Sequence, residues 1–362
     1  MKILHLIYDH INNPWIGGGG AIRVHELYKR LSQKGHIITI VSGKYPHVKN
    51  YEEGNLTLHF VGIDNNYILS TFSYACYANK IIKKHIEKYD IVIEDFAPWN
   101  PVFSYKYNYK VPVVLQIQNY IGRELIKRYA IFGLPFYFIE KYYPLKFKQV
   151  IIVNDILRIR YKLPQSVFIS NGIDDNLLME NITYNNGTYI GFIGRIDFYQ
   201  KGLDILLSQN LGLYIKICGV GKRKDMKRLN ECLSRNKYFV YLGYITGQNK
   251  VNFIKGAKFF VLPSRFEAQP LTILEAAALG RPLIVSDIAE LRYVTDNGFG
   301  ISFKSEDEKD LEQKIKYLWS NDKMVEEMGR KGREFAKNYT WDRIAEEYER
   351  FLITVKEGKH PS

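Results

Sequence analysis

Two glutamates eight residues apart are the part of this sequence whose residue types and spacing point most directly to chemistry. Glu267 and Glu275 lie in the segment PSRFEAQPLTILEAAALG, which spans Pro263–Gly280. A carboxylate about one turn inside a helix that follows a phosphate-binding loop can accept two hydrogen bonds from vicinal ribose hydroxyls. Glu267, in the loop, would face the group that the phosphate carries. Spacing alone fits two solvated glutamates on an ordinary helix equally well.

A strand, a loop and a helix would position these carboxylates. The run KFFVLP (Lys258–Pro263) is short, apolar and aromatic, as expected of a buried parallel strand. Pro270 suits a first helical turn. Apolar residues then follow at helical spacing until a glycine and a proline end the helix: Leu271, Leu274, Ala278 and Leu279, then Gly280 and Pro282. Ligands of open α/β sheets bind beyond the carboxyl ends of the strands, so the loop is the expected binding position.

The segment resembles the donor site of the retaining glycosyltransferases of family 4. The resemblance rests on the paired glutamates, on PSRF before them and on EAAALGRPLIVSD from Glu275 onward. It implies that Glu275 holds the nucleotide ribose and that Glu267 lies at the donor sugar, with Leu271 and Thr272 also binding the donor. Many members have glycine where Pro270 stands. Proline offers no N–H, and Gln269 can supply a side-chain donor instead.

The same resemblance assigns a diphosphate clamp to Arg195 and Lys201. Gly194 and Arg195 end the strand-like run YIGFIGR, and Lys201 follows six residues after Arg195. In such an enzyme the leaving group is a nucleoside diphosphate, and two cations stabilise the charge that develops as the glycosidic bond breaks. Arginine binds bidentately and lysine acts as a point charge. Gly219, in the glycine turn after IKIC, is expected beneath the base or the phosphates.

The first 120 residues contain two further candidates. Gly18, Gly19 and Gly20 belong to a run of four glycines between the strand-like Lys2–Tyr8 and an amphipathic helix. Such a run lets backbone N–H groups approach a ligand closely, although a merely flexible loop is about as consistent with the glycines alone. Gln118 follows the strand-like Pro112–Ile117, where members of the family commonly have histidine. Glutamine keeps the hydrogen-bonding capacity but cannot carry a proton.

Composition limits the class of protein and its partners. The chain has 362 residues and a net charge of +13, and Cys76, Cys218 and Cys232 show no disulfide or metal spacing. We therefore expect a reducing, cytoplasmic location, and we expect the N-terminus to form a first strand and not a signal peptide. The basic residues are dispersed and form no nucleic-acid-binding motif. A diphosphate substrate or an anionic membrane surface explains the charge at least as well.

One aromatic and basic stretch, Ile126–Lys148, allows two interpretations. Aromatic and lysine side chains suit a membrane interface, and the same stripe can pack on a neighbouring helix. Packing is the more common explanation, because Pro135 and Pro144 prevent one long amphipathic helix.

Together these features predict an α/β protein with the GT-B fold, two Rossmann-like, doubly wound parallel-sheet domains facing across a cleft. We expect an acceptor-side domain over 1–175, joined by a C-terminal helix over 340–356, and a donor domain over 188–338. ISNGID (Ile169–Asp174) resembles the family's interdomain signature, and the polar, turn-rich Asn176–Thr188 is the expected linker.

The predicted function is retaining transfer of a sugar from a nucleotide sugar to an acceptor hydroxyl, by a metal-independent hexosyltransferase. We expect a role in cell-surface polysaccharide or glycolipid biosynthesis, with a carbohydrate or lipid-linked acceptor and no nucleic-acid partner. No cofactor is expected besides the nucleotide diphosphate sugar itself, and peripheral contact with the inner face of an anionic membrane stays open. The alternatives are a nucleotide-sugar epimerase of the same architecture and a non-catalytic sugar-nucleotide binding subunit.

Overall fold

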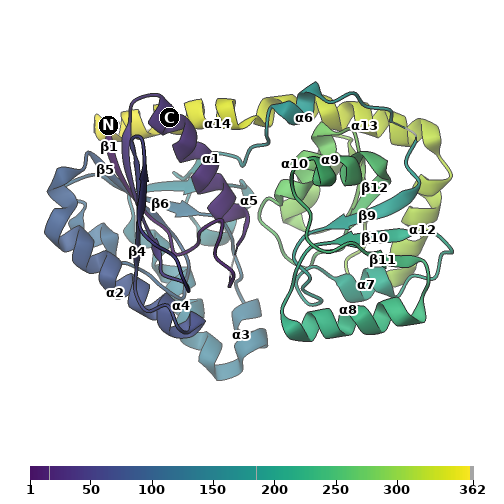
Figure 1. Cartoon of the computed structure of the whole chain (residues 1–362), viewed down its shortest axis with the longest axis horizontal. Helices are drawn as coiled ribbons and strands as arrows, with labels where there is room; N and C mark the ends of the chain where they lie inside the picture. The colour runs from purple at the N-terminus through teal and green to yellow at the C-terminus, as the bar shows by residue number, and fades with distance from the viewer. Residues whose placement is uncertain (16, 185, 359–362) are drawn as a thin grey trace. The chain divides into compact units, whose positions relative to one another are not determined.

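The computed structural model describes residues 1–15, 17–184 and 186–358, which form two compact units. Unit 1 comprises Met1–Asn171 together with the segment that begins at Trp341, and unit 2 comprises Gly172–Thr340. Each unit is built on its own sheet, with helices packed around it (Figure 1).

The described residues of unit 1 form an eight-stranded sheet of order β3-β4-β2-β1-β5-β6-β7-β8, parallel except for the pairing of β3 with β4. Its strands are β1 (Lys2–Leu6), β2 (Ile37–Gly43), β3 (Tyr51–Glu53), β4 (Leu56–Val61), β5 (Ile91–Asp95), β6 (Val113–Ile117), β7 (Gln149–Ile152) and β8 (Val167–Phe168). Its α-helices are α1 (Gly19–Gln33), α2 (Tyr67–His85), α3 (Glu124–Tyr129), α4 (Leu134–Tyr142), α5 (Ile156–Tyr161) and α14 (Trp341–Lys356). Short 3₁₀ turns are η1 (Ile86–Lys88), η2 (Ser104–Tyr107), η3 (Ala130–Gly133) and η4 (Pro144–Lys146).

The described part of unit 2 forms a six-stranded parallel sheet of order β11-β10-β9-β12-β13-β14. The strands are β9 (Tyr189–Ile193), β10 (Ile215–Cys218), β11 (Phe239–Tyr241), β12 (Ala257–Leu262), β13 (Leu283–Ser286) and β14 (Gly300–Phe303). The helices are α6 (Asn176–Met179), α7 (Leu203–Leu207), α8 (Arg223–Arg235), α9 (Gly247–Gly256), α10 (Leu271–Ala278), α11 (Arg292–Asp296), α12 (Glu308–Trp319) and α13 (Asp322–Ala336), with 3₁₀ turns η5 (Ala289–Leu291) and η6 (Lys337–Tyr339).

Both sheets reverse their winding direction at one point, between β1 and β5 in unit 1 and between β9 and β12 in unit 2. Connections on the two sides of such a point leave in opposite directions, which opens a crevice at the carboxyl ends of the two strands. The predicted pair of doubly wound sheets is confirmed. The fold therefore singles out two positions at which a ligand is expected.

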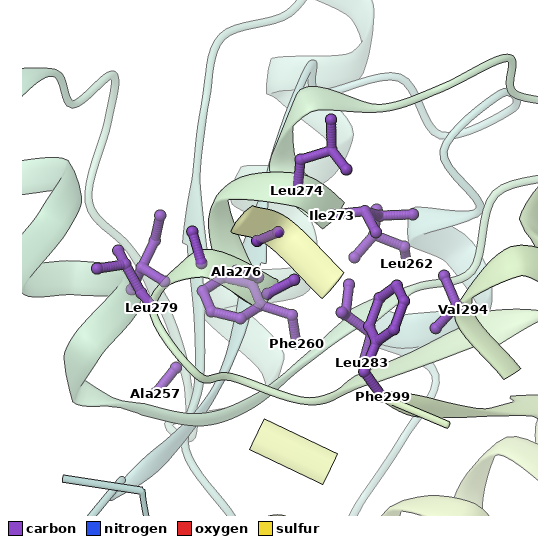
Figure 2. Packing of buried hydrophobic residues seen from close by; sticks show 14 of the residues in the cluster. Ala257, Phe260, Leu262, Ile273, Leu274, Ala276, Leu279, Leu283, Val294 and Phe299 are labelled. Carbon is purple, nitrogen blue, oxygen red and sulfur yellow. The ribbon is translucent and has the colours of Figure 1, made fainter. Parts of the chain in front are cut away.

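The core of unit 2 explains why α10 forms where the sequence predicted it. Every residue of β12 is buried, and the apolar side chains of α10 pack onto it (Figure 2). The outer side of α10 is covered by α13, where a Cβ on Gly329 would lie 2.4 Å from the carbonyl oxygen of Gly280. This close approach fixes α10, and with it the residues at its N-terminus.

Two segments differ from the sequence-based expectation. The sequence pattern predicts a helix over Tyr74–Glu87, whereas α2 begins earlier, at Tyr67, because the Asn66 side chain accepts hydrogen bonds from the N–H groups of Ile68 and Leu69. Within the polar stretch Asn176–Thr188, residues 176–184 belong to unit 2. There the buried guanidinium of Arg281 donates to the carbonyl oxygens of Thr183 and Tyr184 at 2.6 and 3.1 Å.

Among the described residues, no helix has both the length and the apolar character that crossing a bilayer requires.

Candidate active site

The reversal point of unit 2 collects the two cations and the first of the two glutamates predicted from the sequence. Lys201, in the loop after β9, contacts Glu267, in the loop after β12. The same carboxylate oxygen, Oε1, accepts a hydrogen bond of 2.8 Å from the hydroxyl of Ser264. Glu267 is buried and Lys201 is half-buried. Because both side chains are largely shielded from solvent, their charges act strongly on any bound group.

Two features outside the predicted set hold these loops together. Gly202 has a φ of +61°, and a Cβ there would lie 1.9 Å from the carbonyl oxygen of Pro263. A side chain at this position would push the two loops apart. Arg265 bridges them as well, donating two hydrogen bonds to Asp204 at 3.0 and 2.9 Å and one to the carbonyl oxygen of Tyr199 at 2.8 Å.

Arg195 remains available for an anionic ligand. It is exposed just past the end of β9 and forms no hydrogen bond or ion pair with any described residue. Next to it, Gly194 and Gly219 meet backbone to backbone: a Cβ on Gly219 would lie 1.8 Å from the carbonyl oxygen of Gly194. Gly219 has a φ of +141°, so both space and conformation require glycine.

Glu275 is paired with a lysine that the sequence did not indicate. Lys250, on α9, lies 2.5 Å from Glu275 Oε1, while Oε2 is buried and has no hydrogen-bond partner among the described residues. An unpaired buried carboxylate oxygen is costly unless a ligand satisfies it. One turn earlier, the hydroxyl of Thr272 donates to the carbonyl oxygen of Ile193 at 3.2 Å, which ties the start of α10 to the end of β9.

The remaining predicted residues of unit 2 lie at the N-terminus of α10. Leu271 is its first residue, and Pro270 precedes it in an extended conformation without a side-chain cap. Gln269 comes immediately before Pro270 and is half-buried. Positive electrostatic potential at a helix start favours a phosphate or another anion here.

A buried hydroxyl also lies near Glu267. The Tyr293 hydroxyl is inaccessible and has no hydrogen-bond partner among the described residues. Burial raises the pKa of Tyr293, and the nearby negative charge of Glu267 raises it further, so the group stays protonated and can donate.

In unit 1, the reversal point brings Gly20 and Gln118 together. A Cβ on Gly20 would lie 2.9 Å from Gln118 Oε1, so a side chain at this position would displace the glutamine amide. Gly18 donates its N–H to Asp9 at 3.2 Å, and Gly19 begins α1. The glycine run is therefore an ordered helix start over its described residues.

Asp95, at the end of β5, fixes the orientation of Gln118. Gln118 Nε2 donates to Asp95 Oδ1 at 2.6 Å, and Gln116 Nε2 donates to Oδ2 at 2.8 Å. His5 Nε2 lies 2.8 Å from Oδ2 as well. Because its amide nitrogen is bound to the carboxylate, Gln118 presents its carbonyl oxygen as an acceptor.

The apolar run Ile91–Glu94 predicts a strand that ends one residue before Asp95, so the sequence prediction missed Asp95. The available signal was an acidic residue at the carboxyl end of a strand beside the reversal point.

Two family models match the chain. The model described as Glycosyltransferase Family 4 matches residues 17–177, and the model described as Glycosyl transferases group 1 matches residues 187–321. The chain belongs to the family 4, group 1 glycosyltransferases. Two curated proteins are similar in sequence to this glycosyltransferase. This chain is 26% identical over 357 residues to the uncharacterized glycosyltransferase MJ1178 of Methanocaldococcus jannaschii, and the match covers 95% of this chain and 96% of that protein. It is 25% identical over 230 residues to the O-antigen biosynthesis glycosyltransferase WclY of Escherichia coli, covering 57% of this chain and 64% of WclY.

Solved structures identify the glycosyltransferase fold as GT-B. Sucrose-phosphate synthase of Thermosynechococcus elongatus superposes with a TM-score of 0.82 at 16% identity, over 99% of this chain and all of that one. Anabaena HepE in complex with UDP-glucose gives a TM-score of 0.73 at 14% identity, over 98% of this chain and all of HepE. At these identities the likeness establishes the fold alone.

Proposed function

We propose that this glycosyltransferase moves a hexose from a nucleoside diphosphate sugar to an acceptor hydroxyl with retention of configuration, without a metal ion. The observation that carries the proposal is the arrangement at the end of β9. Arg195 is unpaired among the described residues, and it lies close in sequence to Lys201, which contacts Glu267. Cations beside a helix N-terminus can neutralise a departing diphosphate, which is the task a metal ion performs elsewhere.

Each residue then has a role in binding the donor. Arg195 and Lys201 bind the diphosphate, and the unpaired Oε2 of Glu275 accepts a ribose hydroxyl while Lys250 holds Oε1. Glu267 accepts hydrogen bonds from the sugar hydroxyls and orients the ring. The complex of HepE with UDP-glucose supports a donor of this class.

The chemical step is a front-face substitution. The bond between the anomeric carbon and the β-phosphate oxygen breaks, and the acceptor oxygen forms its bond to the same face of that carbon. The acceptor proton passes to the departing phosphate oxygen, so no side chain needs to act as a base. Gln118 accepts a hydrogen bond from a substrate hydroxyl through Oε1, in the orientation that Asp95 imposes.

We assign the acceptor to the carbohydrates or lipid-linked saccharides of cell-surface polysaccharide or glycolipid assembly, as the likeness to WclY suggests. A lipid-linked acceptor would bring the enzyme to the inner face of an anionic membrane.

The test is turnover of radiolabelled nucleotide sugars, chosen by a thermal-shift screen, with and without carbohydrate acceptors. We expect transfer that a chelator leaves intact, an α-linked product from an α-configured donor by NMR, and a loss of about 10²-fold in kcat/KM for Arg195→Ala. An inverted product, or activity that a chelator abolishes and Mn²⁺ restores, would overturn the mechanism. Epimerised donor without transfer would identify an epimerase, and binding without turnover would identify a binding subunit.

A further inference from the structure

A chain of buried polar side chains runs through unit 1 from helix α14 to the reversal point of the sheet. It begins with Tyr348 of α14, Tyr28 of α1 and His5 of β1, and all three are fully buried. The hydroxyl of Tyr28 lies 3.3 Å from that of Tyr348 and 2.7 Å from His5 Nδ1. Buried polar atoms are costly without a partner, so these contacts restrict how each group can point.

Asp95 connects this chain to Gln118. His5 Nε2 lies 2.8 Å from Asp95 Oδ2, and Gln116 Nε2 lies 2.8 Å from the same oxygen. Gln118 Nε2 lies 2.6 Å from Oδ1, and no other described residue hydrogen-bonds to this carboxylate. A carboxylate offers acceptors only, so all three nitrogens donate to it.

These contacts fix the position of the proton on His5. Its Nε2 donates to Asp95, and a neutral imidazole has one N–H, so Nδ1 is left as an acceptor. The Tyr28 hydroxyl therefore donates to Nδ1, and its oxygen accepts from the Tyr348 hydroxyl. Burial raises the pKa of both tyrosines, so both keep the proton that this arrangement requires. Every hydrogen bond then points the same way, from α14 toward Asp95.

Gln116 is held in the orientation in which it donates to Asp95. Arg23 on α1 is fully buried and donates through Nε to Gln116 Oε1 at 3.3 Å. The same guanidinium donates to the carbonyl oxygen of Ser170 and, at 3.2 Å, to Asn171 Oδ1. Because a guanidinium has no acceptor, Gln116 cannot turn its amide over without losing a bond at each end. The Asp95 carboxylate is therefore surrounded by donors of fixed direction.

The result at Gln118 is a single orientation of its amide. Nε2 is bound to Asp95, whereas Oε1 lies beside Gly20 and has no hydrogen-bond partner among the described residues. An amide oxygen accepts and cannot donate, so the partner that fits is a hydroxyl with its proton directed at Oε1. An amide turned the other way would offer an N–H, which suits a partner that only accepts.

We propose that His5 and Tyr28 are positioning residues of the transferase, which act through Asp95 to make Gln118 select a substrate group that donates a hydrogen bond. The inference rests on the proposed function and specifies which substrates the enzyme accepts. His5 and Tyr28 are fully buried, so they act on Gln118 and not on the substrate directly. Helix α14 packs along α1 and takes part through Tyr348 (Figure 1).

The test compares transfer from UDP-glucose, the donor bound in the HepE structure, with transfer from each of its monodeoxyfluoro analogues. Fluorine does not donate, so the wild type should lose about 10–100-fold in kcat/KM at the position that faces Gln118. The same comparison with fluorinated forms of a soluble carbohydrate acceptor covers the acceptor hydroxyls. We call the ratio of kcat/KM for the parent substrate to that for the analogue the fluorine ratio.

Asp95→Asn should remove most of the fluorine ratio at that position. The asparagine oxygen can accept from His5 and Gln116, while its amide N–H donates to Gln118 Oε1. Gln118 then turns its own N–H toward the substrate and tolerates fluorine. Comparing the variant with the wild type on the same analogue cancels the intrinsic effect of fluorine on the reactivity of the sugar.

Two substitutions test the positioning residues themselves. His5→Leu should lower the fluorine ratio by about tenfold, because Asp95 loses the partner that fixes its carboxylate. His5→Gln keeps a donor toward Asp95 and should restore the wild-type ratio. Tyr28→Phe removes one hydroxyl without opening a cavity, and it should lower the ratio in the same direction. It tests the proposal even where His5→Leu fails to fold.

Glu94→Gln provides the matched control. Glu94 is another buried carboxylate of β5, and its hydrogen bonds come from the N–H groups of Val102 and Ser104 and the hydroxyl of Tyr143. This variant should lose stability in urea unfolding and keep the wild-type fluorine ratio, because it does not contact Gln118. Circular dichroism should show that each variant is folded.

A second readout needs no turnover. NMR of the chain labelled at the histidine nitrogens should show His5 with its proton on Nε2, assigned by the loss of that signal in His5→Gln. A His5 ring protonated on Nδ1 would overturn the chain of donors. Transfer with equal fluorine ratios in the wild type and Asp95→Asn would overturn the positioning role and leave the transferase proposal standing. The expected His5 signal without transfer to any acceptor would overturn the transferase proposal, and with it the substrate selection.

Discussion

Replacing Gly202 by alanine should separate the loop that carries Lys201 from the loop that carries Glu267. The new Cβ would lie 1.9 Å from the carbonyl oxygen of Pro263, whereas carbon and oxygen in contact normally lie about 3.3 Å apart. The backbones must therefore part by more than about 1 Å. A displacement of that size at reacting groups costs roughly 10²-fold in rate. The left-handed φ costs alanine about 1–2 kcal/mol, and overpacking adds about 1–3 kcal/mol.

Gly212 provides the matched control for this substitution. Its φ of +67° is close to the +61° of Gly202, it lies in the same unit, and a Cβ there would meet nothing within 4 Å. Gly212→Ala should therefore lose only the conformational part, about 1–2 kcal/mol of unfolding free energy, and keep its activity. The assay compares urea unfolding midpoints and kcat/KM for the donor in the two variants.

A particular pattern would refute this reasoning. If Gly202→Ala matched Gly212→Ala in both stability and kcat/KM, the close contact with Pro263 would not control the position of Lys201. A loss of stability without a loss of activity would show that the site tolerates the displacement, and that the Lys201–Glu267 contact is not required for turnover.

Three further predictions concern polar side chains. Lys250→Met should weaken nucleotide-sugar binding by about 1.5–3 kcal/mol in titration calorimetry, because Glu275 loses its charged partner; unchanged affinity would place the ribose elsewhere. Gln118→His should keep kcat within about tenfold, because Asp95 can hold either side chain. A large gain in kcat, with a new titration between about pH 6 and 7 in the pH–rate profile, would show that this enzyme has lost a proton carrier. Burial lowers the pKa of His10 from 6.5 to about 4, so the folded protein binds this proton less readily than the unfolded chain does. The free energy of unfolding should therefore fall as the pH drops from about 6.5 to 4. The loss should reach at most about 3 kcal/mol in urea unfolding and should be absent in His10→Gln; equal pH profiles would contradict the assignment.

The strands could be predicted from the sequence where a short apolar run is bounded by glycine, proline or polar residues. The apolar runs Leu56–Val61 and Leu283–Ser286 predict two strands with the same bounds as β4 and β13. Helix α9 was not predicted, because GQNKVNFIKG begins and ends with glycine and buries only Phe253 and Ile254. Its conformation depends on packing against the sheet, which propensity does not report.

The candidate site likewise contains some residues that the sequence predicts and others that it does not. Glu267 and Glu275 could be selected because their spacing along one loop and helix is local, and the roles given to them remain predictions. Lys250 could not be selected, since its pairing with Glu275 requires that α9 and α10 lie side by side. In the sequence, Arg265 appears only as the arginine of the PSRF motif, with no sign of its partners. Its bridge to Asp204, 61 residues earlier, depends on the order of strands in the sheet.

Unit 1 needs the last helix of the chain. Tyr348 of α14 is fully buried, its hydroxyl lies 3.3 Å from that of Tyr28, and α14 packs along α1 (Figure 1). During synthesis, the first 171 residues therefore leave the ribosome well before α14 is made, because about 170 residues of unit 2 are synthesised in between. At about 5–20 residues per second, the apolar side of α1 stays uncovered for roughly ten seconds or more. Unit 2 is the first part that can finish folding, and a nascent chain that stalls within it leaves an incomplete unit 1 for chaperones to protect.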